Sequence, residues 1–170
     1  ELFTLIDSLQ SGITFTNRLH DTPEQNIIQY LYYYNGGGVA TGDINNDGLP
    51  DIYFTANSKS NNKLYLNKGD FKFEDITAAA GVAGKADWAS GVTMVDINAD
   101  GFLDIYVTVS SQHHGLTGNN ELYLNNQDGT FTETAEKYGL NFSGMGTQAA
   151  FFDYDRDGDL DCYLLNHSQK

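Results

Sequence analysis

Three short segments of the sequence place aspartate at alternating positions, a pattern suited to binding a hard metal ion. Loop 1 spans residues 43–51, loop 2 spans residues 96–104 and loop 3 spans residues 153–161, and all three follow the pattern Asp-x-Asn/Asp-x-Asp-Gly-x-x-Asp. Alternate residues of a tight loop can direct their oxygens to one centre, and the glycine permits a sharp backbone turn. Ca²⁺ takes roughly six to eight oxygen ligands. The loops therefore predict three Ca²⁺ sites.

Each predicted site uses side chains at loop positions 1, 3, 5 and 9 and the backbone carbonyl at position 7. The predicted ligands are Asp43, Asn45, Asp47, Leu49 and Asp51 in loop 1; Asp96, Asn98, Asp100, Phe102 and Asp104 in loop 2; and Asp153, Asp155, Asp157, Asp159 and Asp161 in loop 3. No loop contains His or Cys, so zinc and copper are not indicated. Mg²⁺ fits less well because it requires a small octahedron and retains water ligands. The alternative is an acidic turn without metal, in which closely spaced carboxylates repel one another.

The charge of the chain is concentrated in these loops. The net charge is −14, and 11 of the 23 acidic residues lie in the three loops. Three Ca²⁺ ions would offset about six of the negative charges. A surface this acidic repels nucleic acid and anionic membranes, so we expect no nucleic-acid partner. No apolar run approaches ~18 residues, and no transmembrane segment is expected.

The residues that follow each loop indicate whether the pattern belongs to an EF-hand or to a loop between two strands. An EF-hand would require Glu at loop position 12 and flanking helices. Position 12 is instead Phe54, Val107 or Leu164, within short runs such as Ile52-Tyr-Phe-Thr. Such β-branched and aromatic runs are typical of strands. We therefore predict that each loop joins two strands and is not an EF-hand.

A longer repeat surrounds loops 1 and 2. The first aspartates of the three loops are 53 and 57 residues apart, and Asn62-Lys-Leu-Tyr-Leu-Asn matches Asn120-Glu-Leu-Tyr-Leu-Asn. Four short strands in a unit of about 50 residues are typical of one propeller blade. The predicted fold class is all-β, a partial β-propeller of four-stranded antiparallel blades with the Ca²⁺ loops between the first and second strands.

The repeat also predicts the blade boundaries. Residues 36–84 form blade 1, residues 88–140 form blade 2 and residues 145–170 begin blade 3. Phe3-x-x-Ile followed by Gly12-Ile resembles Phe73-x-x-Ile followed by Gly81-Val, so residues 1–16 are expected to be the outer strand of a closing blade. Because a propeller needs at least ~4 blades to close, we expect these residues to be part of a longer chain.

The loops and their flanking motifs resemble the FG-GAP/VCBS repeats of integrin-α-like propellers, in particular the bacterial branch related to cartilage acidic protein. The motifs that carry the resemblance begin at Tyr34 (Tyr-Asn-Gly-Gly-Gly-Val-Ala), Leu64 (Leu-Tyr-Leu-Asn-Lys-Gly), Phe73 (Phe-Glu-Asp-Ile-Thr) and Trp88 (Trp-Ala-Ser-Gly-Val-Thr). The resemblance implies a roughly seven-bladed propeller. It also implies an extracellular or cell-surface location, which includes an outer-membrane lipoprotein with a lipid anchor upstream of Glu1.

Two other groups of residues could contact a partner. Tyr30, Tyr32, Tyr33 and Tyr34 could form a stacking platform for sugar or peptide, although packing between blades is the commoner use of such aromatics. His113 and His114 lie in the long connection 110–120, and connections of this length often carry binding residues.

The favoured function is a non-catalytic module, not an enzyme, that binds a protein or glycan through its propeller loops, with Ca²⁺ stabilising each blade. One alternative is a structural subunit of a surface complex. Another alternative is a propeller-based hydrolase or lyase. Its catalytic parts would lie outside this segment, because the segment offers no Ser-His-Asp pattern and its clustered carboxylates are assigned to metal.

Overall fold

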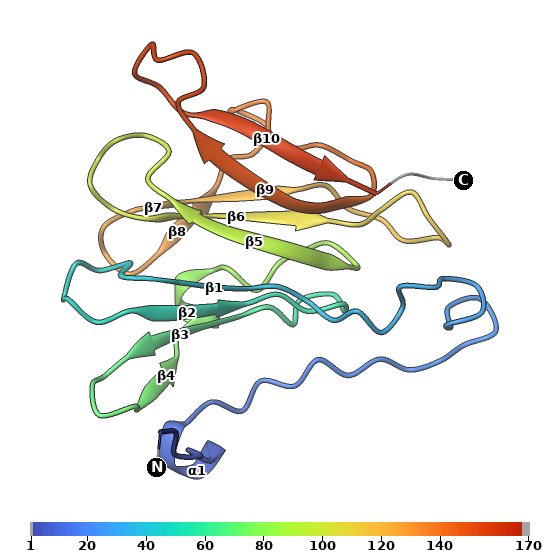
Figure 1. Cartoon of the computed structure of the whole chain (residues 1–170), viewed down its shortest axis with the longest axis horizontal. Coiled ribbons are helices and arrows are strands. Elements are labelled where there is room, and N and C mark those ends of the chain that lie inside the picture. The colour runs from blue at the N-terminus through green and yellow to red at the C-terminus, as the bar shows by residue number, and fades with distance from the viewer. Residues whose placement is uncertain (1, 168–170) are drawn as a thin grey trace.

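Residues 2–167 are described by the computed structural model, in which three antiparallel β-sheets lie side by side (Figure 1). The first sheet has the order β1 (Val39–Gly42), β2 (Asp51–Phe54), β3 (Lys63–Asn67), β4 (Phe73–Asp75). The second has the order β5 (Ala89–Val95), β6 (Asp104–Val109), β7 (Glu121–Asn125), β8 (Phe131–Glu133). The third pairs β9 (Gly146–Phe152) with β10 (Asp161–Asn166). The prediction of four-stranded antiparallel sheets is confirmed.

The two four-stranded sheets share one register, as their sequence repeat requires. Tyr53 pairs with Leu64 in the first sheet, and Tyr106 pairs with Leu122 at the equivalent place in the second. Each of these four side chains is 0–1% exposed. The neighbouring residues Tyr65 and Ile105 are also fully buried, so these strands pack on both of their faces. The repeated Leu-Tyr-Leu motif therefore lies in the core of both sheets.

The hydrophobic core lies between neighbouring sheets. One cluster includes Leu64 and Val82 from the first unit and Val92 and Ile105 from the second. A second cluster joins Tyr106 and Leu122 to the β9–β10 sheet. Hydrogen bonds reinforce this packing near the first strands, because the Ser90 hydroxyl donates to the carbonyl of Gly146 at 2.7 Å. Each sheet is thus stabilised by its neighbour, as in repeat proteins generally.

Gly91 lies where β5 packs closely against β9. A methyl group added to Gly91 would overlap the backbone carbonyl of Thr147 and the side-chain oxygen of Gln148, both on β9. We expect Gly91→Ala to lower the free energy of unfolding by about 1–3 kcal/mol, because the two strands must move apart. Urea denaturation measures this change.

Gly42→Ala is the matched control for this prediction. The two atoms nearest to a methyl group on Gly42 would be Leu103 Cδ1 and Met94 Sδ, at 2.6 and 2.9 Å. Both atoms are at the ends of flexible side chains that can rotate away. Equal losses of stability for the two variants would show that the β5–β9 contact does not determine the spacing of the sheets.

The N-terminal segment has no strand partner among the described residues. Among residues 2–16 the structure has one helical turn, α1 (Ser8–Ser11), and no strand, because no neighbouring strand of the described chain pairs with this segment. The predicted resemblance between residues 3–13 and residues 73–82 is confirmed for the helical turn that each segment contains. Both α1 and α2 (Thr77–Ala80) end at a glycine with φ of 77°, Gly12 and Gly81 respectively. Residue 1 and residues 168–170, the ends of two predicted units, lie outside the described residues.

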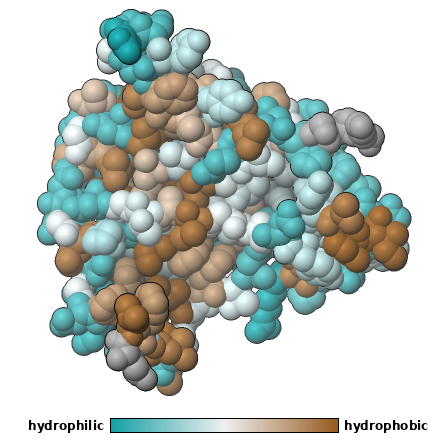
Figure 2. All heavy atoms as spheres, viewed as in Figure 1, coloured by the Kyte–Doolittle hydropathy of each residue, from teal (hydrophilic) through white to brown (hydrophobic). Residues whose placement is uncertain are grey.

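The surface is hydrophobic in places around α1. The side chains of Leu2, Phe3, Leu5 and Leu9 are each 89–95% exposed, and Figure 2 shows hydrophobic residues gathered at this end of the molecule. Within residues 2–167, no helix combines the length and the apolar character that crossing a membrane requires.

Candidate metal sites and the opposite face

Loops 1, 2 and 3 lie at the same edge of the three sheets, at the left of Figure 1. Each loop joins the first strand of its sheet to the second, namely β1 to β2, β5 to β6 and β9 to β10. Position 12 of each pattern falls within β2, β6 or β10, so the prediction that these are not EF-hands is confirmed. The sheets thus position one loop per unit in the same orientation.

The three loops have one backbone shape. Position 4 is left-handed although it is not glycine, with φ of 59° at Asn46, 57° at Ala99 and 65° at Arg156. Position 6 is the glycine of the pattern, with φ of 87° at Gly48, 89° at Gly101 and 98° at Gly158. Two left-handed residues separated by one residue form a tight loop that few sequences adopt. The glycine of the pattern is therefore required by the backbone conformation.

The side chains of loops 1 and 2 also make the same hydrogen bonds. In loop 2, Asp96 accepts the backbone N–H groups of Asp100 at 3.0 Å and Gly101 at 2.8 Å, and Asp100 accepts that of Phe102 at 2.9 Å. The equivalent distances in loop 1 agree to within 0.1 Å. These donors stabilise the ionised carboxylate, and the backbone N–H of Phe102 in particular holds the pKa of Asp100 below its usual value.

The aspartate at position 9 has a structural role that the sequence pattern did not reveal. Asp104 is fully buried and accepts the backbone N–H groups of Ile97 at 3.0 Å and Asn125 at 2.8 Å. Asp51 is equally buried and accepts the corresponding groups of Ile44 and Asn67. These carboxylates connect the loop to the end of the third strand.

Burial raises the pKa of both position-9 carboxylates. For Asp104 the two backbone donors partly offset the effect of burial, and the nearby carboxylates of Asp100 and Asp96 raise the pKa further. The same causes raise the pKa of Asp51. A bound cation would reverse these unfavourable interactions, because it attracts every carboxylate of the loop.

Loop 3 has the densest negative charge. One carboxylate oxygen each of Asp153, Asp155 and Asp161 lies within 4.8 Å of the others, a spacing that could hold a metal ion. Repulsion is visible in the same loop, where hydrogen bonding to Asp157 and its charge raise the pKa of Asp159. Asp161 accepts the backbone N–H of Tyr154 at 2.8 Å, but it is only partly buried because β10 has no third-strand neighbour among the described residues.

The donor atoms fit a hard cation. The side-chain ligands predicted for the loops are all carboxylate or amide oxygens, which suit Ca²⁺. At position 7, Leu49 and Phe102 donate their backbone N–H groups to the position-5 aspartate. The use of the position-7 carbonyls, including that of Asp159, as metal ligands stays a prediction.

Neighbouring loops also contact each other. The Asn125 side chain donates to the carbonyl of Ile44 in loop 1 at 2.8 Å and to that of Leu103 in loop 2 at 3.1 Å. The Asn46 side chain donates to the carbonyl of Gly101 at 3.0 Å. Asn125 ends the repeated Asn-x-Leu-Tyr-Leu-Asn motif, which could have indicated this role. Through these hydrogen bonds, each of the two loops stabilises the conformation of the other.

The tyrosines of residues 30–34 lie on the face opposite loops 1, 2 and 3 (Figure 1). Tyr33 is 3% exposed and packs on Trp88, with ring centroids 5.4 Å apart, so the packing interpretation is confirmed for Tyr33. Tyr32 and Tyr34 remain 39% and 57% exposed. His114 contacts the carbonyl of Gln29 at 2.8 Å and helps to hold the N-terminal segment on this face.

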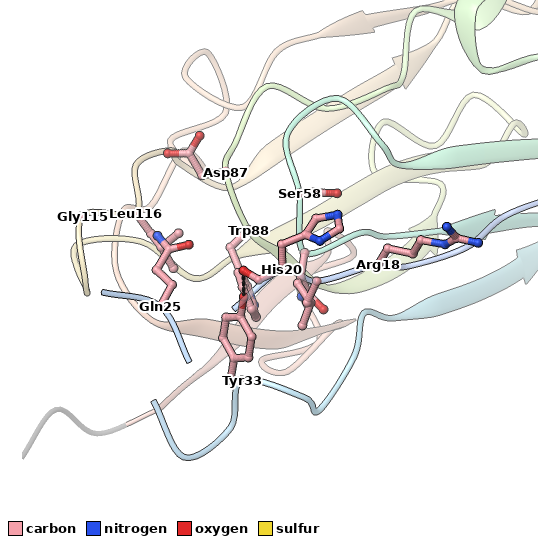
Figure 3. A pocket seen from close by; sticks show the side chains of 11 residues that line it. Arg18, His20, Gln25, Tyr33, Ser58, Asp87, Trp88, Gly115 and Leu116 are labelled. Carbon is pink, nitrogen blue, oxygen red and sulfur yellow. Dashed lines mark hydrogen bonds between the residues drawn. The ribbon is translucent and has the colours of Figure 1, made fainter. Parts of the chain in front are cut away.

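A cavity of about 300 Å³ opens on the same face (Figure 3). It lies where four segments meet, residues 18–33, residues 57–58, residues 87–88 and the connection 110–120. Its lining includes Arg18, His20 and Trp88, a combination that the sequence alone did not indicate.

Comparison with known proteins agrees with this architecture. A family model described as the FG-GAP-like repeat matches residues 43–107 and 109–164, more than half of the chain. Cartilage acidic protein 1 of Xenopus tropicalis is 33% identical over 137 residues, which is 79% of this chain and 20% of that protein. The Homo sapiens protein of that name is 40% identical over 73 residues, covering 43% of this chain and 11% of its own length. The Mus musculus protein is 31% identical over 137 residues, again 79% of this chain and 20% of its own length. The chain thus spans a fifth or less of these relatives.

Proposed function

Because the chain belongs to the FG-GAP-like repeat family, we propose that it forms blades of a Ca²⁺-stabilised β-propeller and acts as a non-catalytic binding or scaffold module. Loops 1, 2 and 3 would each hold one Ca²⁺ ion through the oxygens of positions 1, 3, 5 and 9 and the position-7 carbonyl. The ion would neutralise the loop carboxylates and join the first strand of each blade to the second. The proposed location is extracellular or at the cell surface, with a protein or glycan as partner.

One observation carries the calcium proposal. Loops 1 and 2 reproduce the same side-chain hydrogen bonds to within 0.1 Å, and loop 3 has the same left-handed positions. Every copy also keeps aspartate at positions 1, 5 and 9, and carboxylates this close together repel one another unless a cation compensates their charge. The buried carboxylates of Asp51 and Asp104 add to this argument, because burial of charge is unfavourable unless it is compensated.

The non-catalytic part of the proposal rests on how these carboxylates are used. The position-1 and position-9 aspartates of loops 1 and 2 accept backbone N–H groups of their own unit. Groups held in this way serve the fold, and they are poorly placed to exchange protons with a substrate. The opposite face, with its exposed tyrosines and its cavity, is the surface proposed to meet the partner.

A titration of the metal-free chain with CaCl₂ tests the proposal. We expect saturable calorimetric binding with a dissociation constant of about 0.1–1 mM, as in extracellular Ca²⁺ modules. MgCl₂ at the same concentration should compete poorly, since Mg²⁺ dehydrates reluctantly. Binding of Mg²⁺ as tight as that of Ca²⁺, or no saturable binding of either ion, would reject the calcium proposal.

A further inference from the structure

A buried hydrogen-bonded path joins loop 1 to loop 2. Asp51 accepts the backbone N–H of Ile44 at 3.0 Å, and the carbonyl of Ile44 accepts the side-chain amide of Asn125 at 2.8 Å. The backbone N–H of Asn125 in turn donates to Asp104 at 2.8 Å. These four residues are 0–6% exposed. The path therefore connects the position-9 carboxylate of loop 1 to that of loop 2 through buried groups.

From this path we infer that loops 1 and 2 bind Ca²⁺ with positive cooperativity, and that Asn125 is the residue that couples them. The inference rests on the proposed function, because it concerns how two of the proposed calcium sites influence each other. Position 9 is a proposed ligand in both loops, so an ion that fixes Asp51 also fixes Ile44 and the amide of Asn125. The second ion then binds a loop whose backbone is already positioned, and less conformational freedom is lost.

The side chain of Asn125 is held by both loops. It donates one amide hydrogen to Ile44 and the other to the carbonyl of Leu103, at 2.8 and 3.1 Å. Its oxygen accepts the backbone N–H of Gln127 at 2.9 Å, which fixes the orientation of the amide. Ile44 is position 2 of loop 1 and Leu103 is position 8 of loop 2, so each carbonyl belongs to a residue between two proposed ligands. A displacement of either loop therefore changes the hydrogen bonds of the other.

A second hydrogen bond joins the same two loops at the surface. The exposed side chain of Asn46 donates to the carbonyl of Gly101 at 3.0 Å. Loop 2 has Ala99 at the equivalent position, which offers no side-chain donor toward loop 3. Within residues 2–167, the side-chain hydrogen bonds of loop 3 all stay inside that loop. The coupling is therefore assigned to loops 1 and 2.

Electrostatic repulsion opposes the coupling. An ion bound in one loop reduces the negative potential that attracts a second ion to the other loop. Salt screens this effect between exposed charges beyond about 8 Å at ~0.15 M ionic strength, whereas buried groups are screened much less. At this ionic strength we expect the hydrogen-bonded path to dominate, with a coupling of about fivefold or more between the two affinities.

Glycine amide signals allow each loop to be followed separately. Gly48 and Gly101 donate their backbone N–H groups to the position-1 aspartate of their own loop, at 2.7 and 2.8 Å, so their amide NMR signals report loops 1 and 2. CaCl₂ is titrated into the parent chain and into Asp96→Ala, which disables loop 2. The Ca²⁺ concentration that half-saturates the Gly48 signal should be at least about fivefold higher in Asp96→Ala. Asp43→Ala should raise that of the Gly101 signal by the same factor, because coupling is reciprocal.

Asn125→Ala and Asn67→Ala are a matched pair of variants. Asn67 makes the equivalent bonds within its own unit, from its backbone N–H to Asp51 and from its side chain to the carbonyl of Pro50. Within residues 2–167 its side chain donates to loop 1 alone, whereas that of Asn125 donates to two loops. In Asn125→Ala the effect of Asp96→Ala on loop 1 should fall below about twofold, while in Asn67→Ala it should keep its parental size.

The outcomes separate this inference from the calcium proposal. If neither glycine signal responds to CaCl₂, the proposed sites are rejected and the coupling with them. If both respond but Asp96→Ala leaves loop 1 unchanged, the coupling is overturned and the calcium sites stand. Equal losses of the effect in Asn125→Ala and Asn67→Ala would overturn the role of Asn125.

Asn46→Ala keeps the test decisive if Asn125→Ala does not fold. Alanine is compatible with the left-handed backbone at this position, because Ala99 has φ of 57° in loop 2 and Asn46 has φ of 59° in loop 1. Loss of the bond to Gly101 should reduce the effect of Asp96→Ala on loop 1 by about twofold or more. An effect of parental size in Asn46→Ala would contradict the coupling between the loops.

Discussion

Replacement of Asp104 by alanine is expected to lower the free energy of unfolding by about 3 kcal/mol even when no metal is bound. The buried Asp104 carboxylate accepts two backbone N–H groups, those of Ile97 and Asn125, and it has no solvent exposure. Alanine would leave both donors without an acceptor at this place, and each unsatisfied buried group costs roughly 1–3 kcal/mol. Relief of the buried charge offsets part of this loss, because burial raises the pKa of Asp104 in the folded chain.

Asp100→Ala is the control for Asp104→Ala. Asp100 belongs to the same loop, but its side chain is exposed. In EDTA, urea denaturation should show a loss of less than about 1 kcal/mol for Asp100→Ala. In CaCl₂ both variants should lose the stabilisation that loop 2 gains from the ion. Similar losses for the two variants in EDTA would contradict the structural role assigned to position 9.

Calcium is expected to raise the melting temperature of the chain by about 8 °C or more. With a dissociation constant of about 0.1–1 mM and about 10 mM Ca²⁺, each occupied site adds roughly 1.4–2.7 kcal/mol to the free energy of unfolding. Three sites would contribute about 4 kcal/mol or more, and 1 kcal/mol corresponds to roughly 2–4 °C for a chain of this size. A bound ion would replace repulsion between carboxylates with attraction, most of all in loop 3.

Differential scanning calorimetry in CaCl₂, MgCl₂ and EDTA measures this effect. The shift should be reversible when excess Ca²⁺ is added to the EDTA sample, and MgCl₂ should produce a smaller one. Added NaCl at equal ionic strength controls for general screening of the −14 charge. A melting curve that is the same in CaCl₂ and EDTA would exclude a stabilising role for the ion.

The sequence predicted the parts of the molecule that depend on local chemistry. The strands after each loop, the four-stranded pairing and the glycine at position 6 all follow from short-range patterns such as Asp51-Ile-Tyr-Phe. The burial of Asp104 could not be predicted in the same way. It depends on the third strand ending beside the loop, where Asn125 donates its backbone N–H.

The partners of contacts between units could not be predicted from the sequence, even where a repeated motif marks the residue that makes the contact. The Asn125 side chain reaches the carbonyl of Ile44 in the neighbouring unit, across 81 positions of the chain. The cavity on the opposite face depends on a similar long-range approach, in which Arg18 and His20 come to lie near Trp88. The outer strand predicted within residues 1–16 has no pairing strand among the described residues, so it stays a prediction.

Each Asp-rich loop is proposed to hold one Ca²⁺ ion, and the number of ions bound per chain tests this proposal. Equilibrium dialysis against about 10 mM CaCl₂, followed by atomic emission, should give three ions for the parent chain. Asp43→Ala, Asp96→Ala and Asp153→Ala should each give two, provided that circular dichroism shows the sheets to be intact. A parent chain that binds no Ca²⁺, or single-loop variants that keep the parental count, would contradict the proposed calcium sites.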